Sequence, residues 1–144
     1  MTNESFNGNF TDLLVQTFPH PLSKTSAYTC TSALIGGAVN DVSVNETSVR
    51  PSFRSSLASM SCGIGWTGDG ATDSKYEQAA ILFGQKLQDV GDGVYLNEPS
   101  GYLPNWKQDF WGSNYEKLLR IKHEWDPEKV LTCKYCVGSD EPRE

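Results

Sequence analysis

The sequence predicts an α+β fold in which a partial antiparallel sheet precedes the helices. Residues 28–35 mix β-branched, aromatic and small side chains and stop at a Gly-Gly pair, which is typical of a strand that runs into a turn. Residues 57–64 form a further short strand candidate. Over residues 74–90, apolar side chains recur at three- and four-residue steps and predict an amphipathic helix. The 144 residues suffice for one domain with a buried core.

Composition and charge exclude several classes of function. The formal charge is −6 and the basic residues are scattered singly, so no basic stripe could follow a nucleic acid or an anionic membrane. No segment approaches the roughly 20 apolar residues that span a bilayer. The first residues lack a basic region and an apolar core, so we expect no signal peptide and a cytoplasmic chain. Glycosylation sequons at Asn3, Asn9 and Asn45 leave a secreted parent protein open.

Three further segments are predicted around the sheet. Residues 1–24 are rich in Asn, Ser, Thr and Pro and form an irregular N-terminal segment. Residues 48–53 form another extended segment, which Pro51 confines to a sheet edge because proline lacks a ladder donor. Residues 65–73 carry three glycines and connect the sheet to the helix as a loop.

The helix over 74–90 has signals at both of its ends. Asp73 or Ser74 can act as its N-cap, and Gly91 can end it. Residues 93–98 follow as a short extended piece. This predicts a helix flanked by extended chain.

A second helix is predicted to begin near Ser113. Ser113 and Glu116 have the spacing of a capping box, in which each side chain accepts a hydrogen bond from the backbone amide of the other residue. The helix must stop by residue 126, because Pro127 disfavours helical geometry in the residue before it. Its apolar stripe consists of Tyr115, Leu118, Leu119 and the stem of Lys122.

A glycine motif resembling a nucleotide-binding loop lies at the end of the second strand. Gly63, Gly65 and Gly68 satisfy the GxGxxG spacing. The predicted helix begins about five residues after the third glycine, whereas a dinucleotide-binding helix begins at it. We therefore interpret the motif as a surface loop.

The four cysteines allow several interpretations. Cys133 and Cys136 form a CxxC motif, but Cys30 and Cys62 do not supply the second close pair that a structural zinc site needs. A redox pair normally lies at a helix N-terminus, whereas this one follows the last helix. Small buried or unpaired cysteines are the favoured interpretation, and no metal site is predicted.

The histidines and a run of aromatic residues each have a structural and a functional interpretation. His20 and His123 lack a nucleophile and an acid that the sequence can place beside them, so both are read as solvated. A run of aromatic residues is either a packing ridge or a wall beside a flat ring system. It consists of Trp106, Phe110, Trp111, Tyr115 and Trp125.

Residues 93–140 resemble the C-terminal signature of berberine-bridge-enzyme-like FAD-linked oxidoreductases, the fungal type of the vanillyl-alcohol-oxidase-related superfamily. The upstream run Val49–Arg54 resembles the substrate domain of that family, so residues 25–92 are interpreted as a partial substrate domain and 141–144 as a tail. The matching residues are Tyr95, Asn97, Glu98, Trp106, Phe110 to Gly112, Asn114, Tyr115, Leu118, Leu119, Lys122, Asp126, Pro127 and Cys136 to Ser139.

The resemblance implies roles for five residues. Tyr95 and Asn97 would point together toward the isoalloxazine ring, as alternate residues of one strand do. The Asn97 amide would bind the polar edge of the ring, and Tyr95 is the candidate catalytic residue because its phenol could orient or deprotonate a substrate hydroxyl. Glu98 is a weaker catalytic candidate, since an aromatic residue often stands there in plant-type members. Asn114 and Tyr115 would brace the same strand or contact the cofactor.

The resemblance also implies that the chain is one part of a flavin site. Family members anchor FAD through an Arg-x-Gly-Gly-His segment and glycine-rich backbone, and this sequence has no Gly-Gly-His. The sheet and helices would normally pack on an FAD-binding domain. We expect the parent enzyme to oxidise a small molecule with FAD in fungal secondary metabolism, and the chain alone to be inactive. The alternative is a non-catalytic remnant, or a complementing half that associates with a separate flavin-domain chain.

Overall fold

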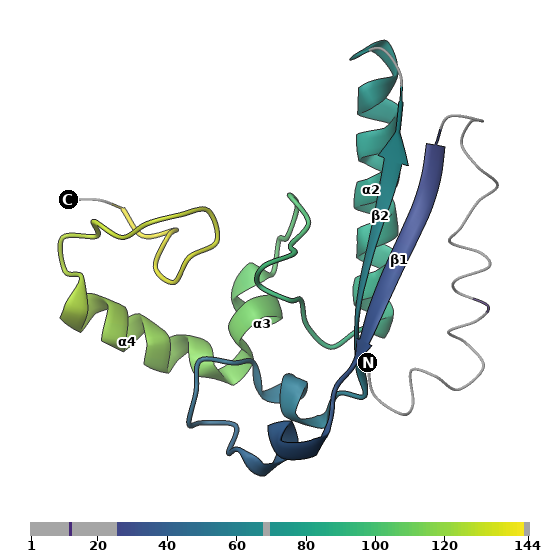
Figure 1. The fold of residues 1–144 in the computed structure, drawn as a ribbon. Coiled ribbons are helices and arrows are strands. Elements are labelled where there is room, and N and C mark those ends of the chain that lie inside the picture. The colour runs from purple at the N-terminus through teal and green to yellow at the C-terminus, as the bar shows by residue number, and fades with distance from the viewer. Residues whose placement is uncertain (1–11, 13–25, 68–69, 143–144) are drawn as a thin grey trace.

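The computed structural model describes residues 26–67 and 70–142 together with Asp12, and it has two arms (Figure 1). One arm is a β-hairpin covered by helix α2, and the other consists of helix α4 and the C-terminal loop. Helix α3 and the chain between α2 and α3 lie between the arms. The predicted irregular segment 1–24, with His20, lies outside the described residues apart from Asp12.

The hairpin confirms the two strands that the sequence predicted near 28–35 and 57–64. β1 (Ser26–Leu34) pairs antiparallel with β2 (Ala58–Trp66), and these two strands form the sheet of the described residues. The α+β class is thereby confirmed. Residues 48–53 do not join the sheet. Pro51, which is preorganised for the first turn of a helix, instead begins the 3-10 helix Pro51–Ser55.

Helix α2 (Gly70–Val90) packs its apolar side on the hairpin. The Phe83 ring meets Tyr28 of β1 with 5.8 Å between centroids, and Tyr76 stacks on Trp66 of β2 at 5.3 Å. Tyr28 and Trp66 lie on one face of the hairpin because side chains alternate along antiparallel strands in this register. The tyrosine and phenylalanine of α2 are almost fully buried, so this contact forms the core of the arm.

The start of α2 differs from the predicted capping residues. The helix begins at Gly70, and Gly65 belongs to β2, so the predicted loop 65–73 is shorter than expected. Asp73 lies inside the first turn, where its carboxylate accepts a hydrogen bond from Trp66 Nε1 at 2.8 Å. The predicted end is confirmed, since the helix stops at Val90 and the Gly91 amide bonds to the Leu87 carbonyl.

The second predicted helix is present over Tyr115–Trp125, and a short helix that was not predicted precedes it. α3 (Trp106–Trp111) and α4 (Tyr115–Trp125) flank the 3-10 turn Gly112–Asn114, and a further 3-10 turn, Gly37–Asp41, follows β1. Gly112 has a φ of +54°, which favours glycine, and a Cβ there would lie 3.3 Å from Pro51. The predicted capping box at Ser113 and Glu116 is wrong, because α4 has no side-chain cap. Its predicted end before Pro127 is confirmed.

Asp126 closes the C-terminal end of α4. Its carboxylate accepts hydrogen bonds from the amides of Val130 and Leu131, at 2.8 and 2.9 Å, and from Lys122 Nζ. The hydrogen bond from Lys122 is the largest cause that lowers the pKa of Asp126 below its ordinary value. Asp126 is 9% exposed, and it therefore fixes the chain that leaves α4.

We expect the pH dependence of stability to depend in part on Asp126. Because the pKa is lower in the folded state, its stabilising contribution is present above the ordinary pKa of about 4 and is lost as the pH falls through the folded-state pKa. The Asp126→Asn variant should therefore lose less stability than the parent between neutral pH and pH 3, as followed by circular dichroism. Glu124→Gln, at an exposed position of α4, is the control that should keep the parent profile.

None of the helices within residues 26–67 and 70–142 is long and apolar enough to cross a membrane.

Candidate functional site

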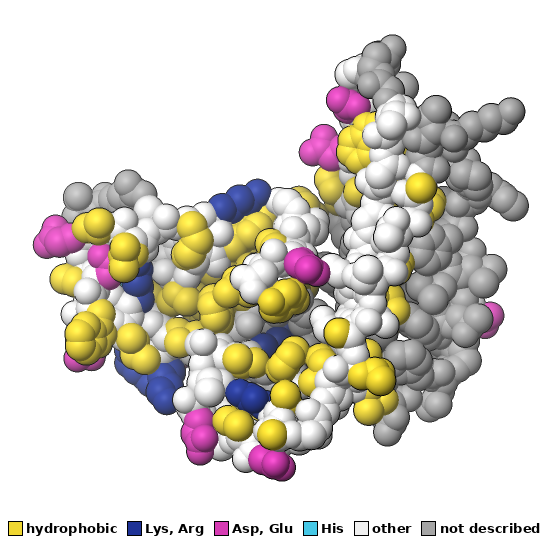
Figure 2. All heavy atoms as spheres, viewed as in Figure 1, with side chains coloured by type: hydrophobic (Ala, Val, Ile, Leu, Met, Phe, Trp, Pro, Cys, Tyr) yellow, Lys and Arg dark blue, Asp and Glu magenta, His cyan; other side chains and the backbone are white. Residues whose placement is uncertain are grey.

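A cavity of about 390 Å³ lies between the hairpin arm and α3. Figure 2 shows hydrophobic side chains gathered on the viewed face in the angle between the arms. The walls come from β2, the C-terminal half of α2, the 3-10 helix Pro51–Ser55 with the loop before it, the chain after α2, and α3. Residues that line it include Val49, Arg50, Phe53, Met60, Leu87, Val94, Tyr95, Asn97, Glu98, Leu103, Phe110 and Trp111.

Three of the predicted site residues meet at this cavity. Tyr95, Asn97 and Glu98 all line it, and the Asn97 amide donates a hydrogen bond to the Tyr95 hydroxyl at 2.7 Å. The predicted extended piece at 93–98 is wrong in its backbone form. It is a turn, in which the Glu98 amide bonds to the Tyr95 carbonyl at 3.1 Å, and among the described residues it pairs with neither strand of the sheet. The turn, in place of strand alternation, brings the phenol and the amide together.

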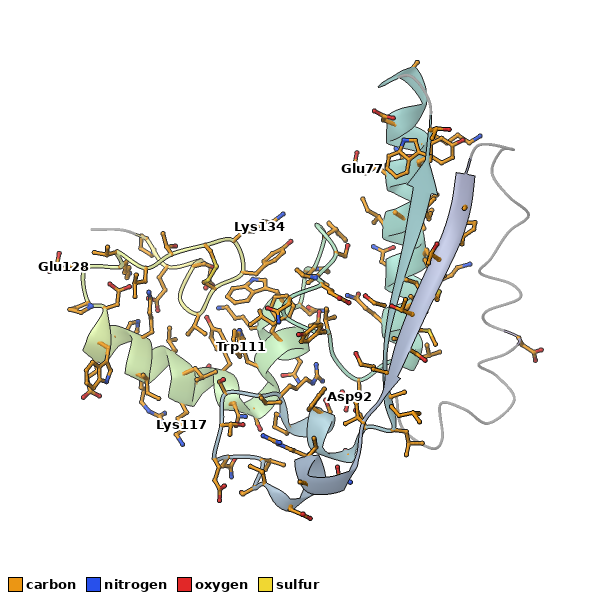
Figure 3. All side chains as sticks on the ribbon, in the orientation of Figure 1. Glu77, Asp92, Trp111, Lys117, Glu128 and Lys134 are labelled. Atoms are coloured by element: carbon orange, nitrogen blue, oxygen red, sulfur yellow. A yellow bond between two sulfur atoms is a disulfide. The ribbon has the colours of Figure 1, made fainter. Side chains whose placement is uncertain are left out.

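Arg50 anchors the chain that carries this turn. Its guanidinium donates to the carbonyls of Gln108 and Asp109, at 2.7 and 2.9 Å, and forms an ion pair with Asp92. Figure 3 shows Asp92 near the junction of the arms and Trp111 on α3. Val94 adds a backbone bond to Asp109 at 2.9 Å, so the turn is tied to the end of α3.

The Arg50 side chain restricts position 93 to glycine and affects the pKa of Asp109. Gly93 has a φ of +118°, and a Cβ at this position would lie 2.6 Å from Arg50 Cδ, so only glycine fits. Burial raises the pKa of Asp109, and the charge of Arg50 opposes that rise. Arg50 was part of the resemblance, but its anchoring role was not predicted, because its partners, the Asp92 carboxylate and two backbone carbonyls, lie 42 to 59 residues away.

Asn114 lies away from the cavity lining, although the sequence predicted it as a cofactor contact. Its side chain is buried, and its amide nitrogen donates to the carbonyls of Val49, Val44 and Thr47 at 2.9, 3.0 and 3.3 Å. The amide therefore holds the loop that leads to Arg50. The bracing that the resemblance suggested falls on this loop.

Tyr115 lies in a second cluster behind α3, and it does not line the cavity either. Its ring meets Trp106 edge to face at 5.6 Å, Lys107 Nζ lies 5.0 Å from its centroid, and its hydroxyl accepts from the Gly138 amide at 3.3 Å. The ring thus joins α4 to the C-terminal loop. A direct contact of Tyr115 with a cofactor stays a prediction.

The residues of the aromatic run do not all lie at one place, and each of the two interpretations applies to some of them. Phe110 and Trp111 line the cavity, whereas Trp106 packs against Tyr115 and Tyr135 in the cluster behind it. Trp125 is 81% exposed and contacts neither. The indole Nε1 of Trp111 is buried and has no hydrogen-bond partner among the described residues, which leaves one donor at the cavity wall unpaired.

Tyr135 was missed by the sequence analysis. It has a φ of +64°, and its hydroxyl accepts from the Leu103 amide at 3.2 Å and donates to the Gly101 carbonyl at 3.0 Å. Its ring also meets Phe110 at 6.2 Å. Tyr135 thereby fixes Leu103, a cavity residue that is 2% exposed. Its position between two cysteines was the only available signal.

The cysteines differ from the prediction, because all four are paired. Cys30 and Cys62 are direct partners in the hairpin register and form a disulfide, and Cys133 and Cys136 form a second one. The sequence could not show that the first two are neighbours, since strand pairing joins residues 32 apart. No group of three or more potential metal ligands occurs in the part of the chain that the structure describes.

The remaining motifs take no part in the cavity. Gly63 and Gly65 lie within β2, so these two glycines of GxGxxG are strand residues, and Gly68 lies outside the described residues. His123 pairs with the Glu141 carboxylate at 2.8 Å on the surface of the other arm.

The geometry defines a wall suited to a flat, partly polar ring. Phe110 and Trp111 supply apolar ring surface, Tyr95 and Asn97 supply a hydroxyl and an amide, and Arg50 is already engaged by backbone carbonyls. The volume lies at the lower end of the range of about 300–1,000 Å³ for small-molecule pockets. It accommodates a ring system, and a complete dinucleotide would extend beyond it.

Comparison with known proteins agrees with this class of site. Residues 94–135 match the family model described as "Berberine and berberine like". The FAD-linked oxidoreductase ffsJ of Aspergillus flavipes is 34% identical over 98 residues, which cover 65% of this chain and 16% of that protein. An uncharacterized FAD-linked oxidoreductase of Arthroderma benhamiae is 37% identical over 108 residues, covering 71% and 19%. The VAO-type flavoprotein oxidase VAO615 of Thermothelomyces thermophilus is 33% identical over 98 residues, covering 65% and 17%.

The predicted resemblance to the C-terminal part of berberine-bridge-type FAD-linked oxidoreductases is therefore confirmed, and residues 94–135 are its berberine-like segment. The chain spans less than a fifth of the length of these three relatives. No solved structure matches the chain.

Proposed function

We propose that this chain is the C-terminal portion of an FAD-linked oxidoreductase that oxidises a small molecule, and that it supplies one wall of the flavin site. The observation that carries the proposal is the cavity turn, where the Asn97 amide and the Tyr95 hydroxyl meet inside the berberine-like segment. Relatives with the same segment bear the names of FAD-linked oxidoreductases.

The residues of the turn fit the isoalloxazine part of FAD. The Asn97 amide has both a donor and an acceptor, so it can bind a ring edge that carries carbonyl and N–H groups. The Tyr95 hydroxyl accepts the hydrogen bond from Asn97, which leaves its O–H group to donate to and orient a substrate hydroxyl. Bound flavin would accept the two electrons of the oxidation as a hydride. Glu98 lies beside both residues and stays the second catalytic candidate.

Apart from the ring, the cofactor needs contacts that this cavity does not offer. The volume of about 390 Å³ leaves the diphosphate and adenine outside it, and these parts contribute much of the affinity for a dinucleotide. A separate flavin domain is therefore part of the proposal. Its source is either the rest of a longer chain or a second chain that this one complements.

We expect the purified 144-residue chain to bind FAD no tighter than about 100 μM, because a ring-edge contact alone leaves most of the binding free energy unmade. Fluorescence titration of FAD measures this. Co-expression with the flavin-domain region of a relative such as ffsJ should give a complex that retains FAD on size exclusion. In that complex, Asn97→Ala should weaken FAD binding about 5- to 10-fold, the equivalent of one net hydrogen bond.

Asn105→Ala is the matched control, because Asn105 precedes α3, makes no side-chain cap and does not line the cavity. Its FAD affinity should equal that of the parent complex. Micromolar binding by the isolated chain, or equal affinities for Asn97→Ala and Asn105→Ala, would contradict the proposed wall. Two independent chains on size exclusion would remove the complementing-half version.

A further inference from the structure

Disulfide pairing changes the expectation about where the chain matures. All four cysteines are joined in two disulfides, one across the hairpin and one in the C-terminal loop. Disulfides persist in oxidising compartments and are rare in the cytosol, where thiol reductants keep cysteines reduced. Cys133 and Cys136 lie in the loop that follows α4, and they are not themselves the first residues of a helix, as the cysteines of a CxxC redox pair normally are. The pairs are structural, and they indicate a secretory environment.

One of the glycosylation sequons lies in the described part of the chain, on an exposed turn. Asn45, Glu46 and Thr47 are all exposed, and the Glu46 amide bonds to the Ser43 carbonyl at 3.2 Å. The middle residue of the sequon is glutamate, which the acceptor pattern allows. Lys117 Nζ binds the backbone carbonyl of Asn45, which leaves the side-chain amide of Asn45 out of that contact. A large polar group on this amide would extend into solvent.

We infer that Asn45 is an N-glycosylation site and that the chain is built to mature in the secretory pathway. The donor is an oligosaccharide on a polyprenyl pyrophosphate. The bond between C1 of the first sugar and the pyrophosphate oxygen breaks, a bond from C1 to Asn45 Nδ2 forms, and the amide loses one proton. Polyprenyl pyrophosphate is the leaving group, so no oxidant or reductant is needed.

The folded structure sets the order of events. In the folded chain the Thr47 hydroxyl already accepts hydrogen bonds from Arg54 Nη2 at 2.8 Å and from the Val49 amide at 3.3 Å. Sugar transfer therefore precedes formation of these bonds. The sequon also lies inside the segment that the Cys30–Cys62 disulfide closes. Asn45 does not line the cavity, and the glycan leaves the candidate site open.

The test is expression of the full chain in yeast behind a cleavable secretion signal. A background with Asn3→Gln and Asn9→Gln isolates the third sequon. We expect this protein to lose the mass of one glycan on endoglycosidase treatment, and peptide mapping should place that glycan on Asn45. Asn45→Gln and Thr47→Ala should remove the shift, whereas Thr47→Ser should keep it, because serine preserves the sequon.

Two results would overturn the inference. The first is an unmodified Asn45 peptide in the secreted background protein, which peptide mapping detects whether or not any variant folds. The second is free thiols at the four cysteines in a non-reducing peptide map, where we expect one linked peptide pair for Cys30 and Cys62 and another for Cys133 and Cys136. Neither result bears on FAD binding, so this inference and the proposed function fail independently.

Discussion

Replacing Arg50 by methionine is expected to lower the free energy of unfolding by about 3 kcal/mol. The guanidinium is 12% exposed and donates to two backbone carbonyls, of Gln108 and Asp109. Hydrogen bonds from a charged donor contribute about 1.5 kcal/mol or more each. The ion pair with Asp92 adds little, because the Asp92 side chain is 55% exposed and solvent screens it. Urea unfolding, followed by circular dichroism, measures the loss.

The Arg50→Met variant should also loosen the turn that carries Tyr95. The Val94 amide, which bonds to the Asp109 carbonyl, should exchange its hydrogen faster because the end of α3 is no longer tied to the chain after α2. Arg50→Lys keeps the charge but cannot form the two-pronged contact, so we expect it to be intermediate. Arg120→Met, on the exposed surface of α4, should stay within about 0.5 kcal/mol of the parent. Equal losses at Arg50 and Arg120 would disprove the anchor.

Asn114→Asp is expected to cost about 3 kcal/mol or more at neutral pH. Asn114 is 4% exposed and its amide donates toward three carbonyl oxygens, so a carboxylate in its place would face acceptors with no proton to share. Burial would raise the pKa of the introduced carboxyl. Its penalty is therefore full above that raised pKa and shrinks as the pH falls below it, since the protonated form can donate once. Urea unfolding at several pH values tests this.

The control for this substitution is Asn105→Asp, which places the same charge before the first turn of α3. Asn105 is exposed and makes no side-chain cap, and a carboxylate is favourable at a helix N-terminus, so we expect a neutral or slightly stabilising effect. These measurements need no flavin. A stable Asn114→Asp variant without pH dependence would show that the buried amide does not hold the loop at 44–49, and it would return Asn114 to a role at the cofactor.

The two strands of the hairpin and the helix on it were predictable because each has a local pattern. Residues 28–35 and 57–64 have the composition of strands, and 74–90 has a helical period of apolar residues. Each pattern describes burial on one side, and the structure satisfies it when Tyr28 and Trp66 pack on α2. These elements could be predicted because the local pattern of apolar residues agrees with the side that the structure buries.

The errors occur where a distant partner overrides the local signal. Asp73 was expected to cap α2, but the Trp66 indole across the turn takes its carboxylate. Residues 93–98 have strand composition, but among the described residues they pair with neither strand of the sheet. Ser113 was expected to cap the second helix, whereas that helix begins at Tyr115, after a 3-10 turn in which Gly112 lies close to Pro51.

The sequence by itself determined the α+β class, the hairpin strands, the C-terminal ends of α2 and α4, and the berberine-like segment. These features depend on local spacing and on fixed motifs. Tertiary structure alone decided which candidates share the cavity. It placed Tyr95, Asn97 and Glu98 together, and it sent Asn114 to the loop at 44–49. The physical reason is that the Cys30–Cys62 disulfide and the hydrogen bonds of Arg50 and Asn114 join residues 32 to 70 positions apart, and no local pattern encodes which of them meet.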